Sequence, residues 1–228
     1  MWRIPVHTNL CNDETTIDVF GISVEEPVTV LTDLIITLVC WVLFFHSSKQ
    51  LPANRVTALY RYFFFVMGLA TLFGGIFGHA FCSVLGIHWK LPGWLLSMVA
   101  VMLAERASII RSAYLMSPLV AQIFRVMNVF ELILLVSLTL VTKNFFFVEF
   151  HAFYGFVVVV GVFEFWHYRK TGNIGSKQLL LSVGVSFVAA LVHILHIELH
   201  TWFNATDLAH TIMSFNAWFL FRAVQKFD

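Results

Sequence analysis

Histidine and aspartate side chains recur near the ends of long apolar segments of this sequence, where few polar residues are expected. Placing an ionisable group in lipid costs free energy, so such residues usually mark a functional site. His193 and His196 are spaced three residues apart, so they share one face of a predicted helix. Asp207 and His210 stand one helical turn apart at the start of the last apolar segment. The candidate site residues are Asp33, His79, His193, His196, Asp207 and His210.

Clustered imidazoles and carboxylates fit two kinds of metal chemistry. Neutral imidazoles and a carboxylate bind Zn²⁺ and leave a position for an activated water, and Asp207 or Asp33 then serves as the catalytic base or orients that water. Histidines on facing helices also ligate haem iron, so haem binding is an alternative. A structural interpretation stands beside both: Asp207 caps its helix, and single histidines are interfacial residues with polar tips. The expected zinc ligands are His79, His193, His196 and His210.

Seven apolar segments must position these side chains. The chain has 228 residues, of which 59% are hydrophobic and only 12% are charged, whereas soluble domains carry roughly 25% charged residues. Each segment is long enough for a helix to cross a hydrocarbon core of about 30 Å. The sequence therefore predicts an all-α, polytopic membrane protein with seven transmembrane helices, at residues 28–45, 58–81, 93–115, 124–141, 145–168, 177–199 and 207–224.

The predicted transmembrane domain leaves only short segments at the two ends of the chain. Residues 1–27 form a polar, acidic N-terminal segment, residues 28–224 a single transmembrane domain, and residues 225–228 a short tail. The formal net charge is +1, and no basic run suggests a nucleic-acid partner. The expected partners are membrane lipid and further membrane subunits of a larger complex.

Basic residues are distributed unevenly between the two ends of the predicted helices. Ten of the fourteen Lys and Arg residues fall at the ends where the odd-numbered segments finish, and three fall at the other ends. Loops rich in Lys and Arg stay on the cytoplasmic side of a membrane. We therefore expect the N-terminus outside and the C-terminus on the cytoplasmic or matrix side, in a bacterial inner membrane or an organellar membrane. In this orientation the candidate site residues share the outer third of the membrane.

A second polar layer lies deeper in the predicted bundle. Glu105 and Arg106 stand in the middle of the third segment, and Glu131 lies at a similar depth in the fourth. A pair between Arg106 and Glu131, or between Glu105 and Arg125, would offset the burial of charge. We therefore interpret this layer as structural.

Four other residues have a predicted environment. Glu164 and His167, near the inner end of the fifth segment, are expected at the membrane interface. Cys11 and Cys82 both fall on the predicted outer side, where an oxidising compartment would permit a disulfide between them. Two unpaired thiols are the alternative.

Three stretches of this sequence resemble an uncharacterised seven-helix family, a domain of unknown function found mostly in bacterial integral membrane proteins. They are "PVTVLTD" opening the first segment, "GGIFGHAF" ending the second, and "LHTWFNATDLAHTIMSFNAWFLFRA" leading into the last. The resemblance covers nearly the whole chain in the order of the segments. The residues that carry it are Asp33, His79, His200, Phe203, Asn204, Asp207 and His210.

More distantly, the layout is similar to the superfamily of alkaline ceramidases and progestin/adiponectin-type receptors. In that superfamily zinc is held by a His that ends the second helix and two His that open the seventh, and His79 and His210 occupy matching places. Gly75 stands where that pattern has Ser, and Ser214 where it has the second His of the last helix. The resemblance implies a zinc-dependent hydrolase of lipid amides or esters. A non-catalytic membrane subunit and a haem-binding membrane protein remain the competing expectations.

Overall fold

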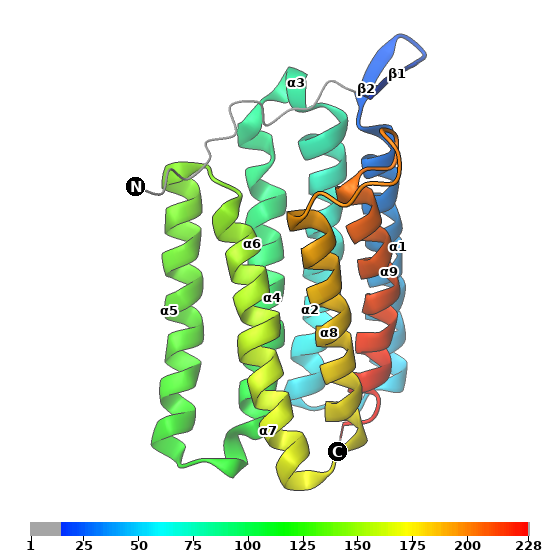
Figure 1. Ribbon diagram of the computed structural model, residues 1–228. Helices are drawn as coiled ribbons and strands as arrows, with labels where there is room; N and C mark the ends of the chain where they lie inside the picture. Colours follow the sequence, from blue (N-terminus) through cyan, green and yellow to red (C-terminus); the bar gives the residue numbers. More distant parts are fainter. Residues whose placement is uncertain (1–14, 228) are drawn as a thin grey trace.

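The computed structural model describes residues 15–227, which form a bundle of long helices running side by side (Figure 1). An antiparallel hairpin of β1 (Thr16–Val19) and β2 (Ile22–Glu25) projects from one end, called here the hairpin end. The other end is called the opposite end. The helical elements are α1 (Pro27–Gln50), α2 (Arg55–Phe73), η1 (Gly74–Ala80), α3 (Cys82–Leu85), η2 (Ile87–Trp89), α4 (Leu91–Ser112), η3 (Ala113–Leu115), α5 (Pro118–Thr142), α6 (Phe146–Phe153), η4 (Tyr154–Val160), α7 (Gly161–Thr171), α8 (Ile174–Ile194) and α9 (Ala205–Val224).

Six helical stretches of the described chain are long and apolar enough to cross a membrane, which supports an integral membrane protein. They are 27–50, 55–80, 87–115, 118–142, 146–171 and 174–194, and they match the first six predicted segments. The seventh predicted segment corresponds to α9, which is not among them. Its sequence carries Asp207, His210 and Arg222 together with several hydroxyl and amide residues, which lower its hydropathy. Because α9 packs along α1 and α8 (Figure 1), it belongs to the bundle, and its crossing of the membrane stays a prediction.

Two of the six long helical stretches contain a π-helical segment, in which the turn is wider than in an α-helix. η1 continues α2 and contains His79, and η4 joins α6 to α7. Such wide turns occur frequently at functional sites, because they change which side chains face a neighbouring helix. Both stretches lie close in the sequence to a histidine, since η1 contains His79 and η4 follows the helix that contains His151.

Polar caps explain where several helices begin. The side chains of Asn54, Ser117, Asn173 and Asn204 accept hydrogen bonds from backbone N–H groups in the first turns of α2, α5, α8 and α9. Those N–H groups have no partner inside the helix, so the caps stabilise each start by about 1 kcal/mol. These four polar residues therefore mark where the helices begin.

The end of α8 differs from the prediction, which extended this helix to residue 199. α8 ends at Ile194, and His196 takes a left-handed backbone conformation with φ 51°. The N–H of Ile197 bonds the carbonyl of Val192 at 3.0 Å, which is a helix-terminating arrangement. The expectation that His193 and His196 share one helical face is therefore wrong.

The helix α5 stands at the edge of the bundle (Figure 1). Four of its residues are buried, namely Ala121, Asn128, Leu135 and Thr139, while most of its apolar side chains are exposed. By contrast, α1, α2, α4, α8 and α9 contribute to one continuous apolar core. Because only four residues of α5 are buried, the two polar ones, Asn128 and Thr139, make up half of its buried residues.

Candidate functional site

A cavity of about 460 Å³ near the hairpin end collects three of the predicted zinc ligands. His79 from η1, His193 from α8 and His210 from α9 all line it, and so do Lys90 and Glu149. The sequence predicts that these histidines lie in the same third of the membrane, and in the fold they line the same cavity. The rest of the lining is mainly apolar and includes Met67, Trp94, Met98, Val101, Phe145, Val148, Phe153, Phe156, Val157 and Met213.

Asp33 lies between two of these histidines. Its side chain is buried, with Oδ1 3.5 Å from Nδ1 of His210 and Oδ2 3.9 Å from Nε2 of His79. The close approach of α1 to η1 depends on Gly75, because a Cβ at that position would lie 2.9 Å from Cβ of Asp33. The glycine that departs from the ceramidase-like pattern therefore has a packing role here.

The protonation of His210 follows from its neighbours. The hydroxyl of Thr32 donates to the carbonyl of Thr29 at 3.0 Å, so Oγ1 of Thr32 is left to accept from Nδ1 of His210 at 3.2 Å. Nδ1 therefore carries a proton, which also faces the carboxylate of Asp33. In the neutral ring the lone pair is then on Nε2. This is the arrangement of a histidine held as a general base.

Glu26 is a site residue that sequence reasoning missed. Its Oε2 lies 2.5 Å from Nδ1 of His79, the ring that also faces Asp33. Glu26 precedes α1 with a left-handed backbone, φ 43°. In the sequence it is one acid within a polar N-terminal segment, and its only signal was its position directly before the first apolar run.

Asp207 makes the contacts of a helix cap. Its Oδ2 accepts from the backbone N–H of Asn204 at 2.8 Å, while Oδ1 of Asn204 accepts from the N–H groups of Thr206 and Asp207. This reciprocal capping box starts α9. Its geometry favours the structural interpretation of Asp207 over that of a catalytic base, and it makes Asn204 part of the same cap.

The other two predicted ligands behave differently from one another. His193 is half-buried, and its Nδ1 lies 2.9 Å from Oε1 of Glu149. His196 is exposed and does not line the cavity. The four expected zinc ligands are thus not gathered around one point.

A compact group of metal-ligating side chains lies elsewhere, in the deeper polar layer. Among residues 15–227, Glu105, Glu131 and His151 form such a group, with ligand atoms within 4.8 Å of one another. Glu105 and Arg106 both contact Asn128, which the sequence did not predict as a partner of either. Asn128 donates to Glu105 at 2.5 Å and accepts from Nε of Arg106 at 2.8 Å.

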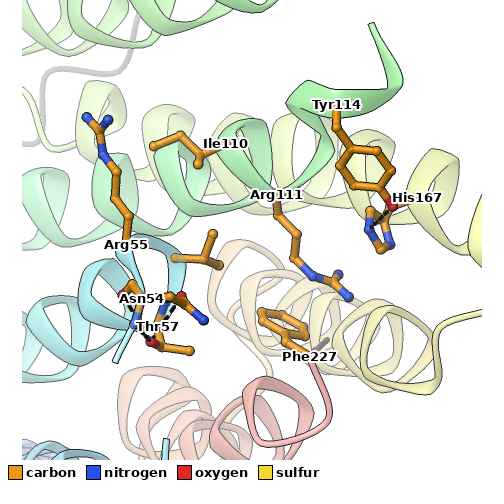
Figure 2. A pocket seen from close by; sticks show the side chains of 9 residues that line it. Asn54, Arg55, Thr57, Ile110, Arg111, Tyr114, His167 and Phe227 are labelled. Atoms are coloured by element: carbon orange, nitrogen blue, oxygen red, sulfur yellow. Dashed lines mark hydrogen bonds between the residues drawn. The ribbon is translucent and has the colours of Figure 1, made fainter. Parts of the chain in front are cut away.

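A second pocket, of about 490 Å³, lies at the opposite end (Figure 2). Arg111 projects into it over the ring of Phe227, with 3.7 Å from Cζ to the ring centroid. Its guanidinium donates to Glu164, Ser176 and Asn173 at 2.5, 2.5 and 2.7 Å. These contacts join three helix ends, so we interpret Arg111 as structural.

The same region corrects one expectation about the membrane interface. Glu164 and His167 are buried rather than interfacial, because Arg111 pairs with the first and Tyr114 and Ser176 bond the second. The expected bridge from Cys82 involves Cys11, which lies outside the described residues.

The comparisons place the chain in a family without assigning it an activity. The profile of a family of unknown function, DUF6962, matches residues 28–228. No curated protein and no solved structure matches the chain. The expected kinship with an uncharacterised membrane family is thus supported, while no match supports the more distant resemblance to the alkaline ceramidases and progestin/adiponectin-type receptors.

Proposed function

Because the chain belongs to DUF6962, a family of unknown function, we propose from its own geometry that it is a membrane protein that binds a single-chain amphiphile in the cavity at the hairpin end. The observation that carries the proposal is the mixed lining of this cavity, which is mainly apolar and includes a smaller set of polar and charged side chains. Its volume of about 460 Å³ falls within the range typical of small-molecule sites.

The polar side chains would hold the head of the amphiphile. His79, His193 and His210 offer ring nitrogens, and Lys90 and Glu149 add charged groups. The apolar wall, formed largely by phenylalanine, valine and methionine side chains, suits an acyl chain because its burial is driven by the hydrophobic effect.

Exposed lining residues favour a ligand that arrives from lipid. Phe153 of α6 and Ile194 at the end of α8 both line the cavity, yet they are 37% and 54% exposed on the apolar surface. An acyl chain can pass between such side chains without entering water. This supports a membrane lipid or fatty-acyl compound over a water-soluble metabolite.

A second candidate function is hydrolysis of the bound amphiphile at an ester or amide bond. The observation that favours it is the pair formed by His210 and Asp33, in which Nε2 of His210 holds the lone pair. As a general base, His210 would take a proton from water as the water oxygen attacks the acyl carbonyl. The imidazolium would then give this proton to the leaving amine or alcohol as the amide or ester bond breaks, which releases the free acid. Asp33 would orient the ring and stabilise the imidazolium that forms.

Zinc in this cavity is the alternative route to the same reaction. The resemblance suggested His79 and His210 as ligands, with His193 or His196 completing the set. The spread of these residues in the structure supports the base mechanism better, since Zn–N bonds of about 2.0–2.1 Å would require them to converge. A chelator distinguishes the two routes, because only the zinc route loses turnover when metal is removed.

Binding is tested with a palmitic acid analogue that carries a photoreactive diazirine. Labelling of the purified chain should map to the cavity, and Ala190→Phe should reduce it several-fold by filling the space. Val188→Phe is the matched control, since Val188 lies on the same helix with 51% exposure and is not a lining residue. Equal labelling of both variants and the native chain would contradict the proposal.

Hydrolysis is tested with fluorescent fatty-acyl amides and esters. His210→Gln and Asp33→Asn should each lower turnover by about 10²–10⁴-fold, which is the usual contribution of general base catalysis, while photolabelling persists. Labelling without any turnover in the native chain would remove the hydrolase and leave the binding function.

A further inference from the structure

Three side chains from three helices meet inside the bundle, apart from the amphiphile cavity. Glu105 belongs to α4, Glu131 to α5 and His151 to α6, and one ligand atom of each lies within 4.8 Å of the others. None of the three lines the cavity at the hairpin end. The first and third are fully buried, and the side chain of Glu131 is 16% exposed.

The environment of His151 defines its tautomer. Nε2 lies 3.0 Å from the carbonyl oxygen of Met98, which only accepts hydrogen bonds, so Nε2 carries the proton. In a neutral ring, Nδ1 then presents its lone pair to Oε1 of Glu131 at 3.0 Å and to Oε1 of Glu105 at 4.0 Å. A lone pair facing two carboxylate oxygens is repulsive unless a cation or a shared proton lies among them. Metal-bound histidines typically show this pattern, with the other ring N–H on a backbone carbonyl.

Glu105 provides an independent observation. Its Oε2 accepts from Asn128, but its Oε1 has no hydrogen-bond partner among the described residues. A polar oxygen left unpaired in the interior costs free energy, and here that oxygen is directed toward His151. Gly155 of η4 makes room for it, because a Cβ at this position would lie only 2.2 Å from Oε1.

The charges of the group also call for a cation. If both carboxyl groups are ionised, two negative charges face one imidazole, and the nearby Arg106 donates through Nε to Asn128. Such a pair of charges inside a membrane protein is unfavourable unless protons or a cation neutralise it. One divalent cation balances both.

We propose that Glu105, Glu131 and His151 bind one divalent first-row transition cation, of the Zn²⁺ or Mn²⁺ type, which fastens α5 to α4 and α6. Carboxylate and imidazole ligands together suit such ions. The partly exposed side chain of Glu131 provides a path for the ion to enter. The bound ion would strengthen the attachment of α5 to the bundle, because α5 has only a few buried residues of its own.

The test is direct metal binding by the full chain in detergent. After removal of metals with a chelator, the protein is dialysed against Zn²⁺ or Mn²⁺ alone and its metal content is measured. We expect about one ion per chain, with loss of that binding in His151→Gln and Glu131→Gln. Asn128→Ala, which removes the support of Glu105, should weaken binding by about 10–100-fold, as is usual for residues behind a ligand.

Two matched controls locate the ion. Glu149→Gln changes a carboxylate on the same helix as His151 and should leave binding unchanged. His210→Gln should also leave it unchanged, whereas a zinc ion in the amphiphile cavity would be lost. Retention of stoichiometric metal by both His151→Gln and Glu131→Gln would overturn the proposal.

Thermal unfolding provides a second readout, which can be taken on the native chain and on a variant. The added ion should raise the Tm of the metal-free native chain, because a ligand that binds only the folded state stabilises it. Glu131→Gln, whose side chain is partly exposed, should fold and show no such rise. A native chain that neither binds the ion nor gains Tm would refute the site, and the group would then be a cluster that shares protons.

Discussion

Asp33 connects the two histidines on which the hairpin-end site depends. Its type and depth were evident from the sequence, and so were those of His79 and His210. Their convergence was suggested only by a resemblance, because the rotation of each helix about its axis is a tertiary property. The contact of Glu26 with His79 was not predictable for the same reason: it depends on the path of the chain just before α1.

Gly75 permits this convergence, so its substitution should be harmful at the residue scale. In Gly75→Ala the new Cβ would lie 2.9 Å from Cβ of Asp33, which forces α1 and η1 apart. We expect a loss of about 1–3 kcal/mol in the free energy of unfolding, as for other overpacked cores. Gly184→Ala is the control, because nothing lies within 4 Å of a Cβ there. Denaturant titration in detergent measures both, and equal stabilities would contradict the packing role.

At the scale of elements, hydropathy located the helices well and their irregular turns poorly. The first predicted helix covered residues 28–45, and α1 spans Pro27–Gln50. The wide turns η1 and η4 went unpredicted, because apolar runs do not reveal a change in backbone hydrogen bonding. His79 lies in η1, and Gly155 of η4 leaves space for Glu105. The sequence instead suggested ion pairs of Glu131 with Arg106 or of Glu105 with Arg125.

The end of α8 gives a prediction that separates a structural role from a metal-binding one. His196 has φ 51°, a conformation that costs non-glycine residues about 1 kcal/mol or more. His196→Gly should therefore stabilise the protein or leave it unchanged in thermal unfolding. It should also retain amphiphile labelling and any turnover. Loss of turnover with intact folding would restore His196 as a member of the site.

At the scale of the whole molecule, the distribution of basic residues still determines the expected orientation. Lys49 and Lys170 lie toward the opposite end of the bundle, and Lys90 and Lys143 toward the hairpin end. The fold was predictable to this extent because long apolar segments joined by short loops must pack antiparallel. Which end of the bundle faces the cytoplasm depends on the distribution of basic residues and not on how the helices pack. Whether α9 forms a seventh crossing stays a prediction.

Orientation is tested with single cysteines and a membrane-impermeant thiol reagent applied from outside. Cysteines placed beside Lys90 and Lys143 should react, and those beside Lys49 and Lys170 should react only after the membrane is opened. The native cysteines are replaced by serine in all variants, with the unsubstituted background as the control. The reverse pattern of labelling would mean that the hairpin end faces the cytoplasm or matrix.

The exposure of Phe153 and Ile194 at the edge of the amphiphile cavity has a consequence for supply. A ligand that enters there diffuses in two dimensions, so occupancy follows its mole fraction in the surrounding lipid rather than its concentration in water. The proposed entrance lies toward one end of the bundle, so a single leaflet would supply it. An amphiphile made in the other leaflet would have to flip across the bilayer first, and the transbilayer asymmetry of the membrane would then set how often the cavity is filled.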